Sequence, residues 1–223
     1  MSLPNVEEVR KRVESIPRKE VRMCLMTAYL FAGRISEVVG HASPKDNTTA
    51  RGPSGKDAKL DSYRDKEPCV VFSVKTAKRQ GLERKVALPL EYESWAEKVY
   101  DYFREFGDDA VFPFTRQKVG MYVDDNEVFS GLTYPIEKYK ICVHQQGVKL
   151  EKVVDRHMRP YTLHALRHSR ASELVDFYGF DGFNLASYGG WTFRTLARTT
   201  VTMDRYLSFS WQSYFEKLLK KRK

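Results

Sequence analysis

The sequence has little cysteine and no long apolar run. Only Cys24, Cys69 and Cys142 occur among 223 residues, and no Cys-x-x-Cys pair is present. Neither a disulfide framework nor a zinc knuckle is therefore indicated, and we expect three small buried side chains. No apolar stretch approaches the roughly 20 residues of a membrane span, and no signal segment opens the chain. We expect a cytoplasmic protein without a membrane partner.

The composition is that of a basic globular protein. Hydrophobic residues make up 42% of the chain and aromatic residues 13%, which is enough for a sizeable core. Lys and Arg outnumber Asp and Glu by 38 to 29, which gives a formal net charge of +9. This balance points to a polyanionic partner, and nucleic acid is the first candidate. No phosphate-binding Gly-x-x-x-x-Gly-Lys loop is present, so no nucleotide cofactor is expected.

Hydrophobic periodicity predicts a mainly α fold with a small antiparallel β-sheet. Two strands, 69–74 and 84–90, should form a hairpin with a basic turn. Residues 41–68 are polar and rich in turn formers, so we expect a long, mobile loop there. The section 109–134 suggests short extended pieces. Helices are predicted over 6–16, 19–30, 34–40, 91–106, 136–146 and 211–219.

The stretch from Thr162 to Trp191 gathers polar groups suited to a phosphate. Thr162 is a good N-cap for a helix that places His164 and Arg167 on one face of its first turns. A helix N-terminus favours an anion, so an imidazole and a guanidinium could meet a phosphate there. Two alternatives stay open. The pair could be solvated surface, or His164 and His168 could bind a metal, although Ala165 stands where a zincin motif needs glutamate.

Five motifs, taken in order, resemble the catalytic set of the tyrosine recombinase (phage integrase) family. They are Gly-Arg34-Ile-Ser-Glu37, Val-Lys75-Thr, His164-Ala-Leu-Arg167-His-Ser-Arg-Ala, Gly-Gly-Trp191 and Asp-Arg-Tyr206-Leu. The resemblance spans about residues 20 to 210 and corresponds to the family's C-terminal catalytic domain. It implies one catalytic domain over 1–223 without the preceding DNA-clamping domain, ending in a tail helix over 211–223.

The resemblance implies a role for each matching residue. Arg34 and Arg167 would hold the scissile phosphate, His164 would assist proton movement, and Trp191 would fill the variable His or Trp position. Lys75 would protonate the leaving 5′ oxygen, and Tyr206 would attack phosphorus to give a 3′-phosphotyrosine. Two guanidiniums can neutralise the charge of a pentavalent phosphorane, so no metal or cofactor is required. The partners implied are double-stranded DNA and, on DNA, three further copies in a homotetramer; the isolated chain would be a monomer, associated with the nucleoid when bound.

Several alternatives remain open at the level of sequence. Trp191 and Tyr206 lie farther apart than is usual in the family, and Ala32 replaces a glycine often found before the arginine motif. Lys78 is a rival to Lys75, and Tyr214 is a rival to Tyr206. The tail could serve oligomerisation or pack on its own domain. The chain could also bind DNA without catalysis, or nick and religate it like a type IB topoisomerase.

Overall fold

The chain is a mixed α+β protein, as its periodicity predicts. A computed structural model describes residues 6–43, 48–75, 83–143, 150–190 and 211–220. Its helices are α1 (Val6–Glu14), α2 (Lys19–Leu30), α3 (Ile35–Val39), α4 (Ala96–Arg104), α5 (Arg116–Asp125), α6 (Leu163–Asp176), α7 (Gly182–Gly189) and α9 (Gln212–Leu218), with a 3-10 turn at Gly55–Asp57. Its strands are β1 (His41–Ser43), β2 (Thr48–Ala50), β3 (Ala58–Tyr63), β4 (Glu67–Lys75), β5 (Glu83–Pro89), β6 (Thr133–Val143) and β7 (Leu150–Pro160). No described helix is both long and apolar enough to cross a membrane.

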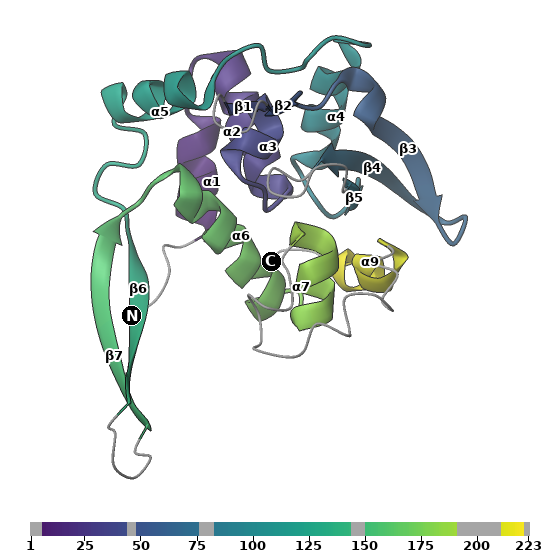
Figure 1. Ribbon diagram of the computed structural model, residues 1–223. Coiled ribbons are helices and arrows are strands. Elements are labelled where there is room, and N and C mark those ends of the chain that lie inside the picture. Colours follow the sequence, from purple (N-terminus) through teal and green to yellow (C-terminus); the bar gives the residue numbers. More distant parts are fainter. Residues whose placement is uncertain (1–5, 44–47, 76–82, 144–149, 191–210, 221–223) are drawn as a thin grey trace.

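Helix α2 is the centre of the helical body (Figure 1). It is apolar almost all round, and nine of its twelve residues are buried, as expected of a helix enclosed on every side. Helices α1, α4 and α6 pack against it. The ring of Tyr29 meets the indole of Trp95 edge-on, with centroids 5.6 Å apart. This packing holds the last turn of α2 in place, and the candidate site begins directly after it.

Strands β3, β4 and β5 form an antiparallel sheet in that order, and the predicted hairpin of β4 and β5 is confirmed. Cross-strand pairs include Phe72 with Val86 and Val74 with Arg84, so these four residues share the face toward the helical body. Phe72 anchors that face, with its ring centroid 5.0 Å from that of Phe31 at the end of α2. The alternation therefore directs the arginine of β5 into the protein.

Helix α9 packs on its own chain rather than standing apart from it. The hydroxyl of Tyr214 donates to the carbonyl of Lys85 at 2.9 Å and accepts the amide N–H of Ala87 at 3.1 Å. Phe215 and Leu218 are buried beside it. The tail helix is therefore seated on β5 of its own chain, and its role in oligomerisation stays a prediction.

Three expectations about local structure were wrong. Residues 41–68 contain β1, β2, the 3-10 turn and β3 rather than only a loop; β3 is an edge strand that buries little more than Ala58 and Tyr63, so its sequence looks polar. Residues 116–125 form helix α5, capped by the hydroxyl of Thr115. Residues 136–146 were predicted as a helix, but β6 occupies 133–143 and pairs with β7 along its whole length. The resulting ribbon extends away from the helical body (Figure 1).

A neutral network of buried charges joins α1, α6 and the segment before α4. Arg170 lies 2.6 Å from Glu173 and 3.1 Å from Glu93, and Glu93 lies 2.6 Å from Arg10. All four side chains are almost completely buried. Two cations and two anions therefore balance inside the core, which is the condition under which buried charges are tolerated.

Candidate functional site

The candidate site is built around the carboxylate of Glu37, at the turn between α2 and α3. After α2 the chain reverses through Ala32, whose φ of 43° is in the left-handed region that favours glycine. Arg34 then caps α3, and its backbone N–H donates to Oε2 of Glu37 at 3.2 Å. The Arg34 guanidinium donates through Nη1 to Oε1 of Glu37 at 3.1 Å and stays about one-third exposed, at 33%. The turn thus holds an accessible arginine on a buried carboxylate.

The space around this turn also favours Gly33. A Cβ added there would lie 3.3 Å from Oε2 of Glu37 and 3.3 Å from Cβ of Phe31. Both distances are tighter than ordinary van der Waals contact. The glycine of the Gly-Arg34 motif therefore lets the chain pass closely behind the carboxylate.

Arg167 reaches the same carboxylate from helix α6, whose predicted start after Thr162 is confirmed. Its Nη1 lies 3.8 Å from Oε2 of Glu37 and donates to the carbonyl of Ala32 at 2.7 Å. Its Nη2 donates to the carbonyl of Gly189, at the end of α7, at 3.1 Å. The side chain is 3% exposed, so the solvated-surface reading is wrong for Arg167. Arg34 and Arg167, far apart in sequence, share one anion.

A third arginine, Arg84 of β5, completes the cluster and was missed at the sequence level. Its Nη2 donates to Oε2 of Glu37 at 3.3 Å and to the carbonyl of Phe31 at 3.0 Å, and its Nη1 donates to the carbonyl of Tyr188. The sequence nevertheless contains a signal that Arg84 is buried. Alternation from Val86 and Leu88 places Arg84 on the buried face of its strand, where a charge must find partners.

The cluster carries more positive than negative charge. Burial alone would raise the pKa of the Glu37 carboxyl, but Arg84, Arg167 and Arg34 hold it below its usual range. Burial lowers the pKa of the Arg167 guanidinium to about 9, and Arg84 and Arg34 act in the same direction while Glu37 opposes them. Arg167 thus remains charged at neutral pH. Three guanidiniums face one carboxylate, and the excess charge is suited to an anion.

His164 lies on the exposed side of α6 beside this cluster. Partial burial lowers the pKa of its imidazole, and His168, Arg167, Arg34 and Arg116 lower it further. The rings of His164 and His168 meet edge-on with centroids 4.8 Å apart. A neutral imidazole at this position can accept a proton. In the part of the chain that the structure describes, no group of three or more His, Cys, Asp or Glu side chains is arranged to hold a metal ion.

Lys75 lies at the end of β4, exposed and paired in register with Glu83. Glu83 directly precedes Arg84, so the backbone of Lys75 lies at the end of the sheet that contacts the cluster. Strand alternation directs Lys75 away from the face of Arg84, and among the described residues no hydrogen bond or ion pair joins it to the cluster. Lys78, Trp191 and Tyr206 lie outside the described residues.

Tyr214, the rival to Tyr206, is buried, as are Tyr178 and Tyr188 near it in the structure. Tyr178, Tyr188 and Tyr214 are at most 2% exposed. Burial raises the pKa of each phenol, and the hydroxyls of Tyr188 and Tyr214 are hydrogen-bonded to backbone groups. None of the three presents a phenol to a substrate.

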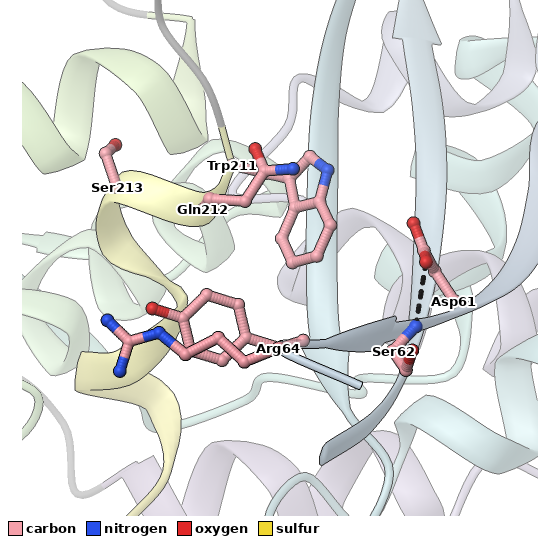
Figure 2. A pocket seen from close by; sticks show the side chains of 7 residues that line it. Asp61, Ser62, Arg64, Trp211, Gln212 and Ser213 are labelled. Atoms are coloured by element: carbon pink, nitrogen blue, oxygen red, sulfur yellow. Dashed lines mark hydrogen bonds between the residues drawn. The ribbon is translucent and has the colours of Figure 1, made fainter. Parts of the chain in front are cut away.

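A surface pocket lies between the end of β3 and the start of α9 (Figure 2). Its lining includes the indole of Trp211 and the ring of Tyr63, and the carboxylate of Asp61 accepts the amide N–H of Ser62 at 2.8 Å. No residue that lines it belongs to the arginine cluster. We therefore do not take it as the functional site.

Comparisons of the chain with protein-family models, with curated proteins and with solved structures gave no match. Any functional assignment therefore depends on the chemistry of the arginine cluster and on the sequence motifs that surround it.

Proposed function

We propose that the chain is a site-specific DNA recombinase of the tyrosine type, which cleaves and rejoins strands through a covalent 3′-phosphotyrosine. One observation carries the proposal most strongly. Arg34 and Arg167, which the motifs pair as phosphate ligands, lie on the same carboxylate of Glu37, at 3.1 Å and 3.8 Å. Motif order alone does not require this meeting of a turn after α2 with a helix that begins at Leu163.

The chemistry needs positive charge at phosphorus. In the cleavage step the phenolic oxygen of Tyr206 forms a bond to phosphorus as the bond to the 5′ oxygen breaks. His164 accepts the proton of the phenol, and Lys75 donates a proton to the 5′ oxygen. The pentavalent transition state carries more negative charge than the diester, and guanidiniums placed in advance stabilise it.

The two arginines have different roles because their exposure differs. Arg34 is partly open to solvent, so its remaining donors can meet a phosphate oxygen. Arg167 is enclosed and already bonded to two carbonyls, so it contributes charge and holds the ends of α2 and α7 together. His164, exposed three residues before Arg167 in α6, completes a surface for one phosphate.

The same proposal specifies partners and location. Double-stranded DNA is the substrate, bound mainly through phosphate neutralisation and hence sensitively to salt. The active assembly is a homotetramer on DNA, formed from monomers. The place of action is the cytoplasm, on the nucleoid.

The test is covalent trapping on nicked DNA. Duplexes of randomised sequence, each nicked so that a short 5′-hydroxyl fragment diffuses away after cleavage, are incubated with the protein and resolved on a denaturing gel. The chain should form an adduct that Tyr206→Phe abolishes and Arg34→Lys strongly reduces, because a lysine cannot offer the bidentate fork. Arg18→Lys, which changes an exposed arginine in a surface pair, is the matched control and should keep the adduct.

Other outcomes would assign the other candidate functions. Retention of native DNA without any adduct would contradict the proposal and identify a DNA-binding protein. Adduct formation at all sequences, together with relaxation of supercoiled plasmid, would identify an activity of the type IB topoisomerase kind.

A further inference from the structure

We propose that Arg84 is a positioning residue, which fixes the β4–β5 hairpin, and with it the strand end that carries Lys75, beside the Arg34–Arg167 pair. The inference rests on the proposed function, because it assigns Arg84 a part in the proton transfer to the leaving 5′ oxygen. Arg84 belongs to none of the five motifs.

The contacts of Arg84 join four separate segments. The residue belongs to β5, while its guanidinium donates to the carbonyl of Phe31 after α2, to Glu37 in α3 and to the carbonyl of Tyr188 in α7. Phe31 precedes Arg34 by three residues, and Glu37 binds Arg34 directly. A single buried side chain thus connects the hairpin to the backbone that carries the accessible arginine.

Only an arginine can make this connection. Three acceptors surround the guanidinium, two of them carbonyls and one a carboxylate, and the planar fork reaches them through two nitrogens. The ammonium of a lysine is a single compact group without the planar fork, so it would lose at least one of these hydrogen bonds. An apolar side chain would lose all three.

The effect of removing Arg84 should fall on the hairpin. Without it, Arg34 still donates to Glu37, and Arg167 still donates to the carbonyls of Ala32 and Gly189. The phosphate-binding pair therefore keeps its own support. The end of the sheet, where Val74 pairs with Arg84 and Lys75 with Glu83, loses the three hydrogen bonds that Arg84 donates to the helical body.

The position of the general acid can be read out chemically. In a duplex whose scissile phosphate carries a 5′-bridging sulfur, the attacking tyrosine oxygen forms its bond to phosphorus and the P–S bond breaks. The sulfur leaves as a thiolate, which needs no proton because a thiol is far more acidic than an alcohol. A variant that has lost only the proton donor is therefore rescued by sulfur, whereas a variant that has lost phosphate binding is not.

The experiment compares single-turnover adduct formation on matched oxygen and sulfur substrates, built on a sequence selected by the wild-type protein. We expect Arg84→Met to lose about 10- to 100-fold on oxygen, as misplacement of a catalytic group by about 1 Å does. On sulfur it should return to within about threefold of the wild type, as Lys75→Met should also do, since the acid's contribution of about 10²–10⁴ is no longer needed. Arg34→Met should stay slow on both substrates.

Two controls separate positioning from general damage. Lys85→Met removes an exposed cation from the next position of β5 and should behave as the wild type. Arg10→Met removes a buried arginine from the other charge network; it should lower stability without selective rescue by sulfur. If Arg84→Met does not fold, Arg84→Lys is compared in the same way.

The results distinguish the positioning role of Arg84 from the proposed recombinase function. An Arg84 variant that folds, is slow on oxygen and remains equally slow on sulfur would overturn the positioning role while leaving the recombinase proposal intact. An Arg84 variant as fast as the wild type on oxygen would overturn it as well. A wild-type chain that forms no adduct on any substrate would overturn the proposed function and the inference with it.

Discussion

Glu37 should be worth several kcal/mol because three arginines depend on it. The substitution Glu37→Gln removes the negative charge with little change of shape. Its side chain is 1% exposed, and those of Arg84 and Arg167 are 6% and 3% exposed, so the cluster has little access to water. Loss of one partner from a buried ion pair costs about 3–5 kcal/mol, because the remaining charge stays buried without compensation.

The expected loss lies near the lower end of this range. Arg84 keeps the carbonyls of Phe31 and Tyr188, and Arg167 keeps those of Ala32 and Gly189. We therefore expect a loss of about 3 kcal/mol in the free energy of unfolding at pH 7. For a domain of this size that corresponds to a fall in Tm of about 6–12 °C.

The difference in free energy of unfolding between the wild type and Glu37→Gln should also depend on pH. Since the folded-state pKa of Glu37 lies below the unfolded value of 4.5, its contribution is present above pH 4.5 and is lost as the pH falls through the folded pKa. Urea denaturation followed by circular dichroism, at pH 7 and at steps below pH 4.5, measures it. Wild type and Glu37→Gln should converge as the solution becomes more acid.

The matched control is Glu105→Gln. Glu105 pairs with Lys19 at 3.0 Å, but both side chains are more than half exposed, so the change should stay within about 0.5 kcal/mol. A Glu37→Gln variant as stable as this control at pH 7 would refute the claim that Glu37 compensates the buried cations Arg84 and Arg167.

Three further predictions concern other parts of the molecule. Arg170→Met should lower the free energy of unfolding by about 3–5 kcal/mol in denaturant titrations, because Glu93 and Glu173 lose their shared cation; a loss below 1 kcal/mol would contradict the network. Tyr214→Phe should cost about 1–3 kcal/mol in the same assay, since it leaves the buried amide of Ala87 and the carbonyl of Lys85 without their partner, yet it should still form the covalent adduct. NMR titration of His164 should give a pKa below 6.5, because partial burial and its neighbouring cations disfavour the imidazolium; a value above 7 would leave the imidazole mostly protonated at pH 7 and would remove it as a neutral proton acceptor.

Local signals in the sequence account for the parts of the fold that were predicted. The apolar density of residues 19–30 and the capping position of Thr162 predict α2 and α6, and alternation predicts the β4–β5 hairpin. These signals act within one element, so they do not depend on what the element contacts.

The errors arose where neighbours decide the structure. Residues 136–143 are apolar at irregular intervals, and their pairing with β7 outweighs any helical tendency. β3 is polar because it is an edge strand. Helix α5 is a different case, since Thr115 as its N-cap and the spacing of Val119 and Val123 are local signals that favour a helix.

In the candidate site, too, local motifs indicate some residues, whereas others depend on contacts made only in the folded chain. The motifs identified Arg34, His164 and Arg167, and the structure brings the two arginines to one carboxylate. Arg84 carries no motif, and its role depends on contacts with α2, α3 and α7 that only the folded chain creates. Glu37 belongs to the first motif, but its burial and its contacts with three arginines depend on β5 and α6, which that motif does not include.

The central claim is that Tyr206 attacks a phosphate held by the arginine cluster, and peptide mapping of the trapped adduct tests it most directly. After nuclease trimming, trypsin should release residues 206–217 as one peptide, because cleavage follows Arg205 and Lys217. This peptide contains both Tyr206 and Tyr214, so fragment ions must locate the added nucleotide. We predict a nucleotide 3′-phosphate on Tyr206 and an unmodified Tyr214. A nucleotide on Tyr214 or on any other residue, or a wild-type protein that yields no adduct, would contradict the account.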